Sequence, residues 1–206
     1  MPVIGVPLLI AVAIIAMAGT RKGWWKHQER RIASAQPQRL ERNSSLQSHL
    51  MRGSDPQFDE AHFLGRVRHA FETAQTSWCR QELEPLRAFV SDGVLERFTL
   101  QIEEQQQDGW QQDMEGVRIG ALTLVHVESG AHFDTLSVRI PFQANIQRRD
   151  LNTRQVIAGS KLPTMEFTEC WSFVRRRGTQ TMNRAGLMEG MCPACGAPLQ
   201  LNQSAI

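Results

Sequence analysis

Two cysteines near the end of the sequence have the spacing of metal ligands. They stand in the run Cys192-Pro193-Ala194-Cys195-Gly196. A tetrahedral zinc ion takes four ligands, and this pair supplies two of them. No second pair follows before Ile206, so Cys192 and Cys195 predict half of a zinc ribbon, metal-free in the monomer. Zinc is expected only where another chain completes the site, as in a homodimer, and no other cofactor is predicted.

A carboxylate interrupts a regular strand pattern. Apolar residues alternate with polar ones from residue 164 to 174, namely Met165, Phe167, Trp171 and Phe173. Glu169 falls on the same face as these residues, and a carboxylate there needs a partner or its pKa rises. Two interpretations stay open: an ion pair or an exposed position at the sheet rim, and a polar group inside a pocket.

Catalysis has little support in the sequence. The motifs GxxxxGK[ST], GxGxxG, HExxH and GxSxG do not occur, and the chain has no tyrosine to stabilise an oxyanion. Glu169 would serve as a base with His126 or His132, but no spacing ties these residues together. We predict a protein that is not an enzyme, with an isomerase- or dehydratase-type enzyme using Glu169 as the alternative.

The first 25 residues have the composition of a membrane anchor. Residues 2–18 carry no charge, which is the short end of what spans a bilayer as a helix. Five basic and aromatic residues that suit a membrane interface follow: Arg21, Lys22, Trp24, Trp25 and Lys26. A cleaved signal peptide ending near Ala18 is the alternative. Because positive charge stays inside, we predict a single-pass anchor with its N-terminus outside and the rest of the chain in the cytoplasm.

Composition divides the remaining chain. The 206 residues carry a net charge of only +2, so a nucleic-acid partner is not expected. Residues 26–54 are basic and polar and predict a tether, 55–180 predict one folded domain, and 181–206 predict a tail with the cysteine knuckle. In a reducing compartment the isolated Cys79 and Cys170 are expected to be core residues.

The folded part predicts helices followed by strands. Asp55 is expected to begin the first helix, which carries an apolar stripe at helical spacing: Phe63, Val67, Ala70, Phe71, Ala74 and Trp78. Further helices are expected over residues 83–90 and from Ser91 onward. Strands are predicted over 121–127, 136–146 and 164–174, and Pro141 indicates an edge or a bulge. The fold class is therefore α+β, with helices packed on one face of an antiparallel sheet. The run Arg175-Arg176-Arg177 is interpreted as a solvated strand end.

These residues together resemble a known family. The strings are Asp55-Pro56-x-Phe58-Asp59-x-x-x-Phe63-Leu64, Ala70-Phe71, Trp78, Leu83-x-x-Leu86, Ser91-Asp92-x-Val94-x-x-x-Phe98 and Glu169-x-Trp171-x-Phe173-x-Arg175. They are similar to the Tim44-like domain, whose bacterial members often carry an N-terminal transmembrane segment and a C-terminal Cys-Pro-x-Cys-Gly knuckle. The motor-recruiting region of the mitochondrial member is not recognisable here, so protein import is not implied.

The resemblance implies a nuclear-transport-factor-two-like fold, a curved antiparallel sheet closed by helices around a cone-shaped pocket. The residues expected to line this pocket are Phe63, Val67, Phe71, Trp78, Phe142, Glu169 and Trp171. It further implies an adaptor or scaffold docked to the bacterial inner membrane. The expected partners are membrane lipid and a membrane protein or complex, of which this chain would be an accessory subunit.

Overall fold

The computed structural model describes residues 37–159 and 164–182, with side chains from residue 44 onward. Its helices are α2 (Pro37–Ser54), α3 (Glu60–Arg80), the short 3-10 helix η1 (Glu84–Leu86) and α4 (Asp92–Gln107). Its strands are β1 (Trp110–Ile119), β2 (Thr123–Ser129), β3 (Phe133–Asp150), β4 (Val156–Ala158) and β5 (Met165–Arg176). The helices come first and the strands follow, which confirms the predicted α+β class. Within this part of the chain, no helix is long and apolar enough to cross a membrane.

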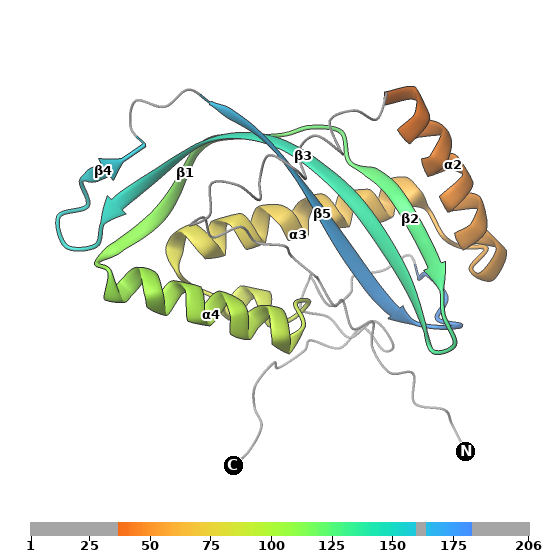
Figure 1. Cartoon of the computed structure of the whole chain (residues 1–206). Coiled ribbons are helices and arrows are strands. Elements are labelled where there is room, and N and C mark those ends of the chain that lie inside the picture. Colours follow the sequence, from red (N-terminus) through yellow and green to blue (C-terminus); the bar gives the residue numbers. More distant parts are fainter. Residues whose placement is uncertain (1–36, 160–163, 183–206) are drawn as a thin grey trace, which may run out of the picture.

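The long strand β3 organises the antiparallel sheet. β1 and β2 follow one another along one side of β3, and β5 and the short β4 lie along its other side. The sheet curves over α3 and α4 (Figure 1). The curved sheet with helices on one face agrees with the predicted architecture.

Pro141 was expected to mark an edge or a bulge. It lies in the central strand β3, so the edge is wrong, and its pairing with β5 shows no bulge at this residue. The N–H of Gly120 donates to the carbonyl oxygen of Pro141 at 2.8 Å. The N–H and C=O of a strand residue point to the same neighbour. The missing N–H of Pro141 therefore faces the connection from Ile119 to Thr123, where the chain passes from β1 to β2 and the ladder is interrupted.

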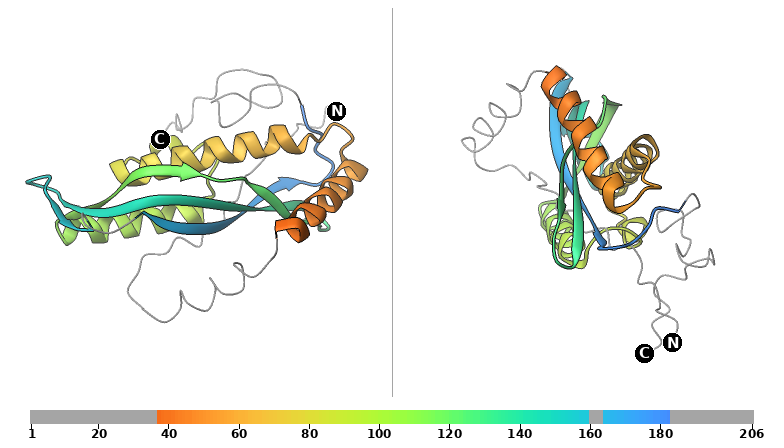
Figure 2. Two further views of the ribbon diagram at one scale, coloured as in Figure 1. Left: turned by 90° about the horizontal axis from the view of Figure 1, so that it is seen from above. Right: turned by 90° about the vertical axis from the view of Figure 1, so that its right-hand side faces the viewer.

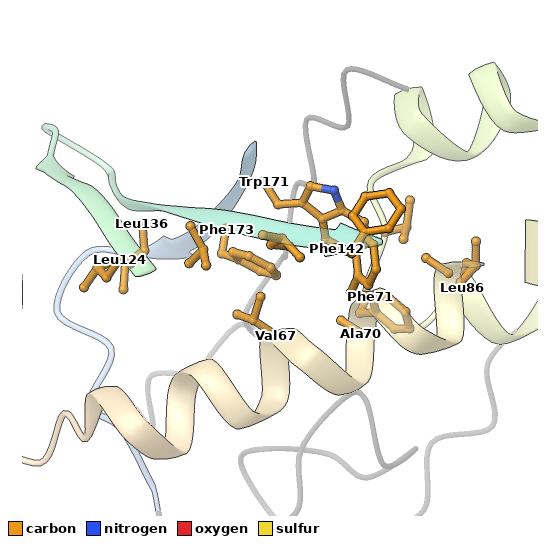
Figure 3. Close-up of a cluster of buried hydrophobic side chains, with 14 of the residues drawn as sticks. Val67, Ala70, Phe71, Leu86, Leu124, Leu136, Phe142, Trp171 and Phe173 are labelled. Atoms are coloured by element: carbon orange, nitrogen blue, oxygen red, sulfur yellow. The ribbon is translucent and has the colours of Figure 1, made fainter. Parts of the chain in front are cut away.

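The core lies between α3 and the sheet. Val67, Ala70 and Phe71 project from one face of α3 towards Phe142 and Trp171 (Figure 3). The ring of Phe71 lies 5.0 Å from that of Phe142 and 5.4 Å from that of Trp171, measured between centroids. Burying side chains of this size stabilises the fold by about 1.5–3 kcal/mol each, which explains why the apolar stripe fixes the position of α3.

Asp55 does not begin the first helix of the domain, contrary to the prediction. Asp59 caps α3 and accepts a hydrogen bond from the His62 N–H at 2.9 Å. Asp55 is completely buried, and its carboxylate lies 2.6 Å from Nη1 of Arg175. Arg175 is buried as well, so the interpretation of the arginine run as a solvated strand end is wrong for this residue. A buried carboxylate needs such a partner more than an exposed helix end needs a cap.

Helix α2 occupies part of the region predicted as a tether over residues 26–54. The hydroxyls of Ser44 and Ser48 donate to the carboxylate of Glu60, in the first turn of α3. The helix also packs beside β2. The tether prediction is therefore wrong for residues 37–54. Polar contacts and one buried apolar side chain, that of Met51, hold this helix to the domain, so it lacks the wide apolar stripe by which a packed helix is usually found.

Two smaller predictions also differ from the structure, and one strand was missed. Residues 83–90 form only the single turn η1, because Pro85 favours a helix start and the chain turns again before Ser91. Strand β1 was not predicted, since its sequence is mostly polar. Cys170 is exposed rather than buried in the core, and Cys79 is half-buried.

Candidate functional site

A polar cleft of about 600 Å³ opens between the C-terminal half of α3 and strand β1. The residues that line it are Gln75, Thr76, Cys79, Arg80, Glu82, Gln111, Asp113, Met114, Val117 and Arg154. Both signs of charge are present in this set. The cleft is large enough for a small molecule or a partner's side chain.

Hydrogen bonds hold the wall of the cleft in place. Arg154 Nη1 donates to Gln111 Oε1 at 2.7 Å, and Gln111 Nε2 donates to the carbonyl of Cys79 at 3.4 Å. Asp113 accepts from Arg149 Nε at 2.6 Å. Burial, and then the charge of Asp113, raise the pKa of the Cys79 thiol to about 11. Cys79 is therefore a neutral thiol at physiological pH and is poorly suited to nucleophilic chemistry.

Glu169 lies behind the cleft, on the face of the sheet that packs against α3. Its Oε2 accepts a hydrogen bond from Trp171 Nε1 at 2.7 Å, and the side chain of Gln75 provides a second hydrogen bond. Burial raises the pKa of Glu169, and these two hydrogen bonds only partly oppose the rise. Gln75 also lines the cleft, so its side chain links the Glu169 carboxyl group to the cleft. Glu169 is half-buried and bound by hydrogen bonds, which disfavours an ion pair at the rim, and its place inside a ligand pocket stays a prediction.

The histidines considered for catalysis lie far from Glu169 or on the other face of the sheet. His126 pairs with Ser137 and Glu169 pairs with Ile140, and side chains alternate along β3, so His126 and Glu169 lie on opposite faces. His132 precedes Ile140 by about eight strand residues, which is roughly 26 Å. Neither histidine is therefore placed to assist Glu169 in proton transfer.

The residues predicted to line a cone-shaped pocket form the apolar core. Val67, Phe71, Phe142 and Trp171 are each no more than 5% exposed. Phe63 and Trp78 are partly buried and pack against the same core. None of the residues predicted for the cone-shaped pocket lines the polar cleft; only Glu169 is linked to the cleft, through its hydrogen bond with Gln75. Core packing accounts for these six side chains, and their role in ligand binding stays a prediction.

An exposed apolar face on α2 was missed by the sequence reasoning. Leu46 is 55% exposed and Leu50 is 53% exposed, and they are one helical turn apart. The buried Ser44, Ser48 and Met51 occupy the other side of the helix. The four-residue spacing of the leucines was the available signal, but it is visible only once the segment is known to be a helix.

Two groups of predicted site residues lie outside the described part of the chain. One is the membrane-interface group Arg21, Lys22, Trp24, Trp25 and Lys26, together with the predicted anchor over residues 1–25. The other is the cysteine pair Cys192 and Cys195. Within residues 37–159 and 164–182, no group of three or more His, Cys, Asp or Glu side chains is arranged to hold a metal ion.

The described part of the chain is an α+β domain with an apolar core, an exposed apolar face on α2 and a polar cleft, which is an architecture compatible with a binding domain. The model of the Tim44-like domain family matches residues 44–184, which is more than half of the chain. The chain therefore belongs to the Tim44-like domain family. The match begins within α2, which supports the placement of that helix in the domain. No curated protein matches the chain.

Proposed function

We propose that this chain is a membrane-tethered, non-catalytic binding or scaffold module that docks to the bacterial inner membrane and to a partner protein or lipid, as an accessory subunit of a membrane complex. Membership of the Tim44-like family is compatible with a binding module. The apolar segment and the basic stretch that precede α2 in the sequence support a position beside the membrane.

The observation that carries the proposal is the exposed leucine pair of α2. Large apolar side chains exposed side by side on a helix mark docking surfaces more often than isolated ones do. Leu46 and Leu50 are each about half exposed, so covering them contributes on the order of 1 kcal/mol apiece. Together they would strengthen docking by roughly thirtyfold.

The opposite side of α2 is fixed to the domain, which makes the leucine face a rigid surface. The hydroxyls of Ser44 and Ser48 bind the Glu60 carboxylate, and Met51 is completely buried. A preorganised helix loses little conformational entropy when a partner covers its exposed face. The proposal needs no internal lipid site, because the side chains predicted to line one fill the core.

Mass spectrometry of the full chain purified in mild detergent tests this proposal. We expect the wild-type chain to retain a membrane protein or lipid, and the Leu46→Ser/Leu50→Ser variant to lose most of it. Leu100→Ser on α4 is the matched control, since Leu100 is 60% exposed and lies on a different helix. Equal retention by the wild type and both variants would remove the α2 face from the proposal.

A further inference from the structure

Among the described residues, strand β5 forms an edge of the sheet along its whole length. It pairs with β3 in an unbroken register from Met165 to Arg176. The N–H of Arg177 donates to the carbonyl of His132, which extends the same ladder. In an antiparallel pair, alternate residues point their N–H and C=O groups at the partner strand. The odd-numbered residues of β5 therefore face β3, and the backbone groups of the even-numbered residues point outward.

The other long strands of the sheet carry devices that block their outer edges. On β2, the side-chain oxygen of Gln47 accepts from the Val127 N–H at 2.6 Å, and α2 lies alongside. On β1, the Gln105 side chain accepts from the Gln112 N–H at 3.2 Å, and a register shift follows Glu115. Such blocking is how natural sheets prevent pairing with further strands.

β5 has no comparable device within the described residues. It contains no proline and no register shift. Among the described helices and strands, only β3 packs its backbone along β5. Figure 2 (left) shows β5 along one margin of the sheet, with β3 between it and the strands β1 and β2. A long, regular, unblocked edge is a template for pairing with another chain.

The charges on the outer face of β5 indicate which strand would pair with its free edge. Glu166 and Arg176 are both exposed, carry opposite charges and stand at opposite ends of the strand. Glu166 accepts a hydrogen bond from Gln143 Nε2 at 3.0 Å, which holds its side chain on the outer face. An antiparallel copy of β5 presents the same two charges in reverse order. The strand is therefore complementary to itself.

We propose that two copies of this chain pair through the free edge of β5, antiparallel, with Glu166 of each copy opposite Arg176 of the other. This inference goes beyond the proposed function and does not depend on it. The two-fold axis passes at Trp171, and the outward-pointing backbone groups of the even-numbered residues then bond to one another. A shift by two residues in either direction separates both charge pairs, and a shift by one residue places the side chains on the wrong face.

Charge reversal tests the register in the full chain in detergent. Opposite charges directly across two strands stabilise pairing and like charges destabilise it, and each dimer holds two such pairs. We expect Glu166→Arg alone or Arg176→Glu alone to weaken dimerisation at least tenfold, measured by sedimentation velocity over a concentration series. The double reversal Glu166→Arg/Arg176→Glu should restore it. A monomeric wild-type chain, or a double variant no better than the singles, would overturn the proposal.

Disulfide trapping gives an independent test of the same register. The proposed pairing places Cys170 of one copy opposite Ser172 of the other, with Cα atoms about 5.5 Å apart, within the range of a disulfide. The background carries Cys192→Ser and Cys195→Ser, so that any dimer joined through the cysteine knuckle is removed. In this background, Ser172→Cys should give a disulfide-linked dimer on mild oxidation.

The exposed Ser45 on α2 supplies the matched control, because Ser45→Cys adds a thiol on a helix that packs beside β2 and not along the outer edge of β5. We expect it to form at most a minor fraction of the cross-linked dimer that Ser172→Cys forms. Equal cross-linking at both positions would contradict the proposal. A wild-type dimer that disappears in the Cys192→Ser/Cys195→Ser background would contradict it too, since the knuckle would then hold the two copies together.

Discussion

Replacing Arg175 by methionine should destabilise the domain strongly, because Arg175 is the cation of a buried charge cluster. Its Nη1 lies 2.6 Å from Oδ2 of Asp55, and its Nε lies 3.4 Å from Oδ2 of Asp134. Both carboxylates are at most 1% exposed. Thr181 also donates to Asp55, from its hydroxyl at 2.5 Å and from its N–H at 3.0 Å. The cluster therefore joins the segment between α2 and α3 to the segment after β5.

The expected loss follows from the burial. Removing one partner of a buried ion pair typically costs about 3–5 kcal/mol, because the remaining charge has no solvent and no counterion. Here two carboxylates would remain, so we expect Arg175→Met to lower the free energy of unfolding by at least about 3 kcal/mol. Urea denaturation of the full chain in detergent, followed by tryptophan fluorescence, measures this difference.

Arg87→Met is the matched control. Arg87 Nε lies 2.9 Å from Glu84 Oε2, but both side chains are largely exposed, and such pairs contribute at most about 1 kcal/mol. A loss below about 1 kcal/mol for Arg175→Met, or equal losses for the two variants, would refute the reasoning. The pH dependence of the free energy of unfolding tests the same cluster in a second way.

Burial alone would raise the pKa of Asp55, but the hydrogen bonds from Thr181 and Arg175 outweigh it, and the pKa is lowered from its usual 3.8. A carboxylate with a lowered pKa in the folded state stabilises the protein above the pKa of the unfolded chain. That contribution is lost as the pH falls below about 4 and passes through the pKa of the folded state. An Asp55→Asn variant should lack this part of the acid sensitivity.

Three further predictions follow from single side chains. Burial raises the pKa of Glu169 above its usual 4.5, so the folded state loses stability as the pH rises from the pKa of the unfolded chain through the pKa of the folded state. Glu169→Gln should therefore be more stable than the wild type at pH 8 but not at pH 4, measured by urea denaturation at both pH values. Phe71→Ala should cost about 3–5 kcal/mol in the same assay, since Phe71 is completely buried between rings of the sheet. A membrane-impermeant maleimide should label Cys170 before Cys79, because Cys170 is exposed and Cys79 is half-buried; with the proposed orientation, it should label Cys170 in inverted membrane vesicles but not in intact cells.

The sequence predicted the elements that bury an apolar face. The stripe from Phe63 to Trp78 identified α3, and the alternations within 136–146 and 164–174 identified β3 and β5. Ser91 and Asp92 marked the start of α4 correctly. In each of these elements one face packs against the same core, so the spacing of apolar residues within the element is enough to predict its type.

Elements held by polar contacts were missed because their partners lie far away in the sequence. Helix α2 is fixed by serine hydroxyls on Glu60, and β1 carries mostly polar residues along the margin of the sheet. Arg175 was taken for part of a solvated run, since nothing local shows that Asp55 faces it. The same limit applies to the functional surface: Leu46 and Leu50 form an exposed pair only once α2 is placed against the domain.

Site-specific photo-crosslinking in intact membranes tests the central claim most directly, namely that the leucine face of α2 docks to the membrane or to a partner there. A photo-reactive residue replaces Leu46, Leu50 or, as the control, Leu100 in the full chain. We predict adducts with lipid or with a membrane protein from positions 46 and 50, at several times the yield from position 100. Equal yields at the three positions, or adducts from position 100 alone, would contradict the claim.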